Sequence, residues 1–231
     1  MRDARSDKMA VLDPEKGTEQ MAVQKTDAEK RCSAFTTVVD WMIENSVGDV
    51  PGYVSKLREQ NANISDDDLA WKILHRKTFK NGLVGAFTGV GGLITLPVAV
   101  PADLLASWRI QIFMAMSIAH VYGLQPESAD LKTDVYLILA GDSAKEALKR
   151  AGIEVSKGVT KKAVEKYVTR EVMKKIWKVI PQKIITKAGE KSMTSFMKMV
   201  PLIGAPVGFV FDYAAARTVG KTAIYYYSGK G

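Results

Sequence analysis

Cysteine and histidine are scarce in this sequence, and their scarcity removes several kinds of chemistry. The 231 residues include one cysteine, Cys32, and two histidines, His75 and His120. A single cysteine excludes an intramolecular disulfide and makes a reducing compartment the default environment. Two histidines without an HExxH motif provide no ligand set for zinc hydrolysis, so we expect no metal site.

Motifs of nucleophilic and nucleotide chemistry are also missing. No GxSxG elbow occurs, and the glycine cluster at residues 89–92 lacks the Lys-Ser/Thr pair of a phosphate-binding loop. Cys32 lies in an apolar helical pattern, which is typical of an inert thiol rather than of a nucleophile. We therefore predict a protein that is not an enzyme and that holds no cofactor.

The N-terminus lacks the apolar core of a secretory signal peptide, which predicts a cytoplasmic protein. Residues 1–25 combine mixed charges with Asp13-Pro14 and Gly17 and have little apolar surface to bury, so we expect a flexible segment. The chain as a whole is 47% hydrophobic and 25% charged, which is an ordinary globular composition. Residues 26–231 are accordingly predicted to form a single domain.

Helical periodicity dominates the first part of this domain. Apolar residues recur at helical spacing from Phe35 to Met42, until Gly48 and Pro51 end the element. Ser65 followed by three aspartates predicts the capped start of another helix, because carboxylates stabilise the first turn. Successive side chains on a helix point in different directions, which favours capping over metal binding for this acidic triplet.

Charge almost disappears between Asn81 and Gly123, where Asp103 and Arg109 are the only formal charges. Four glycines in the first half of this stretch are spaced by three, four and three residues, which places them on one side of a helix. Glycine costs about 1 kcal/mol per helical position relative to alanine, so such a stripe predicts close approach of another backbone. A glycine-rich loop is the alternative. The residues of the stripe are Gly82, Gly85, Gly89 and Gly92.

Two prolines interrupt the apolar run that follows the stripe. The 22 residues from Asn81 to Ala102 are uncharged, which is long enough to cross a bilayer. However, Pro97 and Pro101 remove amide donors and disfavour helix in the residues before them. We therefore predict a helix that ends near Gly92, an extended link and a new helix from Pro101, in a re-entrant or interfacial hairpin rather than a crossing. The new helix is apolar around nearly its whole circumference, which predicts a buried central helix.

Positive charge is concentrated between Lys145 and Lys198, where 15 Lys or Arg occur against 5 Asp or Glu. Residues 160–180 form an amphipathic pattern, with aliphatic residues on one side and basic residues around the remainder. A basic helix that carries a tryptophan is typical of helices resting on anionic lipid, and a solvated surface helix is the alternative. We do not expect nucleic acid as a partner, because no nucleic-acid motif accompanies the charge. The predicted membrane or partner contacts are Lys161, Lys162, Lys166, Arg170, Lys174, Lys175, Trp177 and Lys178.

The C-terminal part repeats the character of the charge-poor stretch. Residues 199–211 are uncharged, and Asp212 and Arg217 follow them much as Asp103 and Arg109 occur in the first stretch. Two pseudo-equivalent apolar hairpins packed on each other would explain this repetition. Because buried charges need partners, we predict that Asp103 pairs with Arg217, or Asp212 with Arg109, across two antiparallel helices in a structural role.

Four short motifs resemble those of the EcsC protein family over about residues 65–228. They are GAFTGVGGLITLP from Gly85, IAHVYG at the end of the Asp103 helix, LILAG from Leu137, and VPLIGAPVGFVFDY from Val200. Membrane-associated proteins with a similar Pro-x-Asp helix and Tyr-Gly ending are a competing match. The resemblance implies a bacterial helical protein, with a founding member encoded beside an ABC transporter and no established activity. The family's charged pair after the Tyr-Gly motif is replaced here by Asp130-Leu131-Lys132, which puts any role of that pair in doubt.

Together these patterns predict an all-α protein, with a buried central helix and two Gly/Pro-rich apolar helical hairpins in a single domain after a flexible N-terminus. We expect it to associate peripherally with the inner face of an anionic bacterial membrane without catalysing a reaction. Two alternatives remain open. One is a soluble module whose basic face binds an acidic protein partner, and the other is a carrier of a hydrophobic ligand. No pattern favours a particular oligomeric state.

Overall fold

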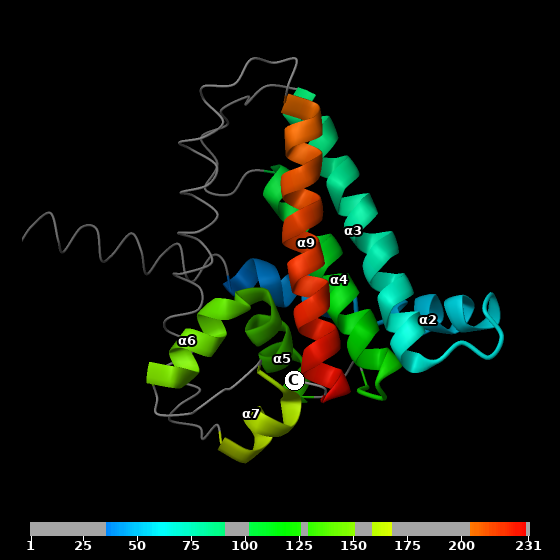
Figure 1. Ribbon diagram of the computed structural model, residues 1–231, viewed down its shortest axis with the longest axis vertical. Helices are drawn as coiled ribbons and strands as arrows, with labels where there is room; N and C mark the ends of the chain where they lie inside the picture. Colours follow the sequence, from blue (N-terminus) through cyan, green and yellow to red (C-terminus); the bar gives the residue numbers. More distant parts are fainter. Residues whose placement is uncertain (1–35, 91–101, 126–128, 151–158, 168–203, 230–231) are drawn as a thin grey trace, which may run out of the picture.

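The computed structural model describes residues 36–90, 102–125, 129–150, 159–167 and 204–229. These ranges contain helices and their connections and no β-strand, which confirms the predicted all-α fold (Figure 1). Residues 36–44 are helical. The helices that follow are α2 (Asp49–Glu59), α3 (Asp66–Val90), α4 (Ala102–Val121), α5 (Ala129–Ala140), α6 (Asp142–Arg150), α7 (Lys161–Tyr167) and α9 (Gly204–Ser228).

Helix α3 begins at the predicted cap. The backbone N–H of Asp68 donates to the Ser65 hydroxyl at 3.1 Å, and that hydroxyl donates to the Asp68 carboxylate at 2.7 Å. Asp66, Asp67 and Asp68 place negative charge in the first turn, where the helix dipole and the free amides favour it. From this start the helix continues without a break into the glycine stripe and reaches Val90.

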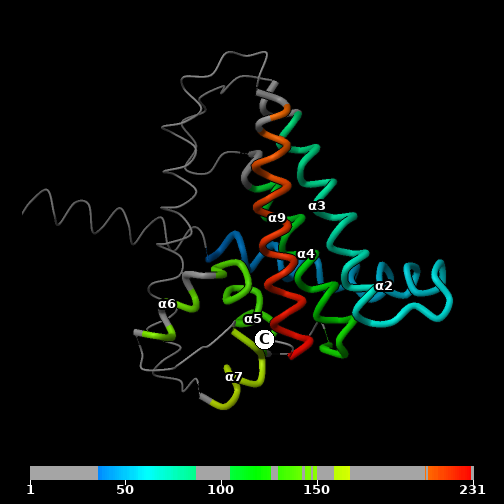
Figure 2. The backbone as a smooth tube through the Cα atoms, in the orientation of Figure 1, coloured from blue at the N-terminus to red at the C-terminus, as the bar shows by residue number. Residues whose placement is uncertain are grey.

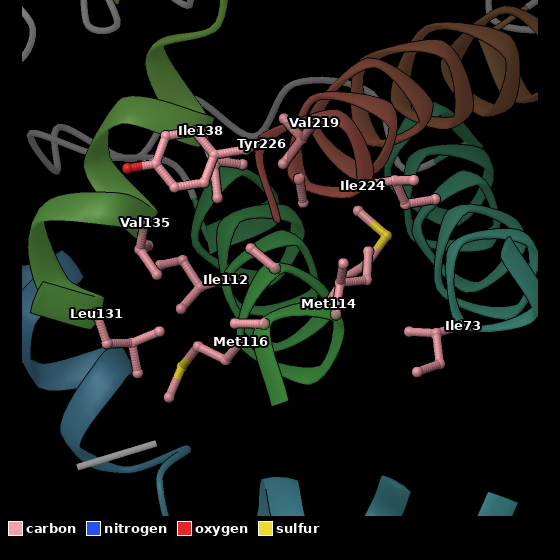
Figure 3. Close-up of a cluster of buried hydrophobic side chains, with 14 of the residues drawn as sticks. Ile73, Ile112, Met114, Met116, Leu131, Val135, Ile138, Val219, Ile224 and Tyr226 are labelled. Carbon is pink, nitrogen blue, oxygen red and sulfur yellow. The ribbon is translucent and has the colours of Figure 1, made fainter. Parts of the chain in front are cut away.

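Helix α4 is the buried centre of the domain, as predicted. Its Ile112 and Met114 side chains have no exposed surface, and Figure 3 shows apolar side chains from α3, α5 and α9 gathered around it. The helix ends at Val121, and Gly123 follows it with a φ of 88°, which glycine readily adopts. This conformation lets the N–H of Leu124 donate to the Ala119 carbonyl at 3.0 Å, which satisfies one of the last free carbonyls of the helix.

Helices α3 and α9 lie side by side in opposite directions over most of their length (Figures 1 and 2). Their backbones touch at Gly85 and Gly208, because a Cβ atom added to either glycine would overlap the carbonyl oxygen of the other. The glycine stripe predicts such a contact. Further along α9, Gly220 makes room for Leu74 of α3 and Met114 of α4, so the three helices meet there.

The other glycines of the stripe differ in what surrounds them. A Cβ atom on Gly82 would lie 2.7 Å from the ring of Phe209, so this glycine accommodates an aromatic side chain of α9. Gly89 belongs to α3, and Gly92 lies outside the described residues. The predicted link around Pro97 also lies outside them.

The structure of α9 contradicts the predicted symmetry between the two apolar segments. Pro206 lies in the first turn of α9, where the backbone amides have no intrahelical acceptor, so proline does not interrupt the helix. Residues 204–228 therefore form one uninterrupted helix, and no second hairpin occurs within them. Asp212 lies inside this helix, whereas Asp103 is the second residue of α4, so the two aspartates do not begin equivalent helices.

Replacing Gly85 with alanine should destabilise the fold, because the added methyl group would overlap the Gly208 carbonyl and push α3 and α9 apart. We expect a loss of about 1–3 kcal/mol in the free energy of unfolding, measured by urea denaturation. Gly52→Ala is the matched control, since Gly52 lies within α2 and its added Cβ meets nothing within 4 Å. Its free energy of unfolding should rise by about 0.5–1 kcal/mol, because alanine is favoured over glycine inside a helix. Equal changes in both variants would contradict a required backbone contact.

Candidate functional site

The hydrophobic core reaches only part of the way along α3 and α9. Among the described residues, the core side chains nearest the far end are Leu74 on α3, Ala216 on α9 and Trp108 on α4. Beyond them, residues 78–90 of α3 and residues 204–215 of α9 form a projection that we call the arm. Figure 1 shows the arm extending past α2, α5, α6 and α7.

Small and polar residues hold the arm together. Thr78 and Asn81 have no exposed surface, and Gly82 and Gly85 face α9. The Asn81 side chain donates from Nδ2 to the backbone carbonyl of Asp212 at 2.9 Å, which bonds the two helices directly. Its Oδ1 atom is buried, and the described residues supply no donor for it. The interface inside the arm is therefore built from glycine, threonine and asparagine rather than from large aliphatic side chains.

Large apolar side chains lie on the outside of the arm instead. Val210 is 62% exposed, Phe79 55%, Phe211 50% and Leu83 40%. A helix pair in water normally buries such side chains and exposes polar ones, so the arm has the reverse pattern. Small residues and side-chain hydrogen bonds between helices, with apolar side chains facing outward, are typical of helices packed against each other in lipid.

A row of aromatic rings runs down one side of the arm. The rings of Phe79 and Phe209 meet edge to face with centroids 5.8 Å apart, and Phe209 stacks on Tyr213 at 5.8 Å. The Tyr213 hydroxyl accepts a hydrogen bond from Arg217 at 3.2 Å. The row therefore leads along α9 from Phe209, beside Gly82, to a guanidinium group at the base of the arm, with Phe79 of α3 against its first ring.

Basic side chains surround the base of the arm. Arg76 and Lys80 on α3 and Arg109 on α4 are exposed. The contacts of Gly220 with α3 and α4 set the register of the three helices, and this register places Arg109 about level with Lys80. From Lys80 to its end at Val90, α3 carries no further charge. On α3, the boundary between the charged and the uncharged part of the helix therefore lies at Lys80.

Lys77 is turned away from this outer surface. Its ammonium group lies 3.9 Å from the ring centre of Phe113 and 4.1 Å from that of Tyr53. Burial, and to a smaller extent the neighbouring Lys80, lowers the pKa of Lys77 to about 8. Because a cation is attracted to aromatic faces, Lys77 ties α3 to α2 and α4.

The family model that describes the EcsC protein family matches residues 14–229. The chain belongs to the EcsC family. The EcsC match covers every described residue and begins further towards the N-terminus than the motifs alone predict, within the segment expected to be flexible. Comparisons of this EcsC protein with curated proteins and with solved structures find no match.

The predicted basic contact segment is described only at its start. Within α7 of the EcsC protein, Lys162 and Lys166 are exposed. Lys161 instead donates to the Asp134 carboxylate at 3.1 Å and lies 3.8 Å from that of Glu165, so it anchors α7 on α5 rather than facing outward as predicted. The remaining predicted contacts lie outside the described residues, and they are Arg170, Lys174, Lys175, Trp177 and Lys178.

Asp134 is a buried carboxylate that the sequence patterns did not single out. It accepts hydrogen bonds from the Tyr226 hydroxyl at 2.6 Å and from Lys161. The buried Tyr227 hydroxyl lies near the same carboxylate without the geometry of a full hydrogen bond. Burial raises the pKa of Asp134, and the bonds from Tyr226 and Lys161 partly oppose this rise. The sequence feature that could have identified Asp134 is its position on the apolar face of α5, three residues after Leu131.

The two predicted Asp–Arg pairs concern residues of α4 and α9. Arg109 is exposed, and Arg217 donates to Tyr213. The Asp212 carboxylate packs into the α3–α9 interface, and the ion pairs among described residues do not include Asp212 with Arg109. The side chain of Asp103 lies outside the described residues, so its pairing with Arg217 stays a prediction. In the same region of α4, the amide of the buried Gln111 donates to the hydroxyl of the buried Ser107 at 2.9 Å.

Neither a metal centre nor a bilayer-spanning helix occurs in the part of the chain that the structure describes. No three His, Cys, Asp or Glu side chains there could together hold a metal ion. No helix there combines the length and the apolar character needed to cross a membrane.

Replacing Lys161 with methionine should destabilise the protein in a pH-dependent way. Because its pKa is raised, Asp134 stays protonated in the folded protein at pH values where it is already ionised in the unfolded chain. Ionisation of the buried carboxyl group therefore lowers the stability of the folded protein as pH rises. Without Lys161, we expect the free energy of unfolding, measured by urea denaturation, to fall by about 1–3 kcal/mol near pH 7. The decrease should be smaller near pH 5. Lys162→Met, at an exposed neighbour, should change little at either pH. A loss of equal size at both pH values would contradict this account.

Proposed function

We propose that this EcsC family protein associates peripherally with an anionic bacterial membrane, on its cytoplasmic face, and acts there without catalysing a reaction. The contact is made by the outer surface of the arm together with the basic residues at its base. The observation that carries the proposal is the reversed pattern of the arm, with glycine and asparagine inside and large apolar side chains outside.

Transfer of the exposed apolar side chains into lipid would favour binding. Complete burial of a Val, Leu or Phe side chain contributes about 1.5–3 kcal/mol. At least 40% of the surface is exposed on each of four side chains, Val210, Phe79, Phe211 and Leu83. Burying them in lipid would together contribute on the order of several kcal/mol to the binding free energy. Since these four side chains belong to a single projection, one contact could bury all of them.

The charge at the base of the arm complements an anionic surface. Arg76, Lys80 and Arg109 are exposed there, and each basic residue near an anionic membrane contributes about 1 kcal/mol. Figure 1 shows α7 at the opposite end of α9 from the arm, so Lys162 and Lys166 are not the charges next to its apolar surface. The basic residues of α3 and α4 therefore supply the electrostatic part of the proposed contact.

Removing apolar side chains from the arm should weaken binding to vesicles of phosphatidylglycerol and phosphatidylethanolamine. For the double variant Leu83→Ser with Val210→Ser, we expect a loss of about 2 kcal/mol, or roughly thirtyfold in affinity, measured by flotation. The double variant Trp41→Ser with Tyr225→Ser is the matched control, because both side chains are similarly exposed but lie outside the arm. Unfolding curves should show that both variants remain folded. Equal losses in the two variants would argue against the arm as the contact.

Removing basic residues at the base of the arm should lower binding most at low salt. We expect Lys80→Gln with Arg109→Gln to weaken flotation by about 2 kcal/mol, roughly thirtyfold, and to have a smaller effect at high salt, where charges are screened. Lys56→Gln with Lys149→Gln removes the same charge from exposed positions on α2 and α6 and should weaken binding much less. If the wild-type protein does not float with anionic vesicles at all, the membrane proposal fails and an acidic protein partner becomes the better candidate.

A further inference from the structure

We infer that the arm enters one leaflet of the membrane end-on, with Lys80 and Arg109 at the level of the lipid phosphates. This inference rests on the proposed function and adds to it the depth and the orientation of the contact. Three features of the arm support it independently: the length of its uncharged part, the distribution of its apolar side chains and the position of its first charges.

The uncharged part of the arm matches half a bilayer in length. Helix α3 runs ten residues without a charge from Asn81 to Val90, and α9 runs eight from Gly204 to Phe211. At 1.5 Å per residue these stretches are about 15 Å and about 12 Å long. The hydrocarbon core of a bilayer is about 30 Å thick, so one leaflet contributes about 15 Å. The described helices of the arm thus fit one leaflet and are too short for two.

The apolar side chains extend around the arm rather than along one face. Val210 and Phe211 are 62% and 50% exposed although consecutive residues point about 100° apart around a helix. Phe79 and Leu83 add exposed apolar surface on α3, one turn apart. An arm lying flat on the membrane would bury one side and leave the other in water. Insertion along the helix axes places Leu83, Val210 and Phe211 in lipid, with Phe79 beside Lys80 at the level of the phosphates.

The first charge of α3 from the tip, Lys80, and the exposed Arg109 of α4 lie where an inserted arm would leave the hydrocarbon. Lys80 and Arg109 are exposed at about the same level, and Arg76 follows one turn below Lys80. Long basic side chains at this level reach phosphate groups while their stems remain in apolar surroundings. Tyr213, bonded to Arg217, lies near the same level, where tyrosine is enriched in membrane proteins. Asp212 is turned into the helix interface rather than towards lipid.

Depth can be measured with one fluorescent probe at a time on the full-length chain. Cys32→Ser removes the natural cysteine, and Leu83→Cys, Val210→Cys, Lys80→Cys or Tyr225→Cys then provides a single site for a bimane label. Vesicles of phosphatidylglycerol and phosphatidylethanolamine would carry a nitroxide quencher either on the acyl chain or on the headgroup. Unfolding curves and flotation of each labelled protein show that it is folded and bound.

We expect acyl-chain nitroxides to quench the labels at positions 83 and 210, with a blue shift of their emission and loss of quenching by aqueous iodide. The label at position 80 should be quenched best by headgroup nitroxides. The label at position 225, at the other end of α9, should remain accessible to iodide and serves as the control.

Two results would overturn the inference while leaving the proposed function intact. One is flotation with labels 83 and 210 quenched only from the headgroup, which would mean that the arm rests on the surface. The other is acyl-chain quenching of the label at 225 as strong as that at 210, which would mean that the molecule inserts in another orientation. Absence of flotation would instead reject both the inference and the proposed function.

Discussion

Backbone contact between Gly85 and Gly208 is the constraint on which the arm depends. Dispersion attraction weakens steeply as atoms separate, so a side chain at either position would loosen the α3–α9 pair along the whole projection. Each glycine in a helix costs about 1 kcal/mol relative to alanine. The close approach also lets Asn81 reach the Asp212 carbonyl, which joins the helices through a hydrogen bond, while the Phe209 ring packs against Gly82. Other large apolar side chains of the arm, such as Val210 and Leu83, face outward.

The two ends of α9 place polar and apolar groups in opposite ways. At the arm, polar atoms lie inside and apolar rings outside. At the other end, Tyr226 is buried with its ring in the core and its hydroxyl on Asp134, and Lys161 completes the bonds to that carboxylate. A buried carboxylate without such partners would be costly, so the second end is a conventional protein interior with satisfied polar groups. One helix thus packs into a conventional protein core over one half and exposes large apolar side chains over the other.

Local patterns in the sequence predicted the helices well, because caps and breaks depend on nearby residues. Ser65 and Gly123 mark helix ends whose geometry needs only a few neighbours. The glycine stripe indicated a close contact but could not name Gly208 as the partner, since that pairing joins segments more than a hundred residues apart. The basic neighbours of Lys161 predict a surface charge, whereas its actual position depends on Asp134 in another helix. Tertiary contacts of this kind leave almost no local signal.

The α3–α9 register is fixed at three points along the pair, by Gly85 against Gly208, by Asn81 against Asp212 and by Leu74 against Gly220. A single inserted residue in α3 between the second and third points would turn the rest of the helix by about 100°. Gly85 would then leave the interface, and a bulky side chain would take its place. Changes in chain length over the course of evolution should therefore collect in the connections between these two helices, while the spacing of residues inside each helix stays constant.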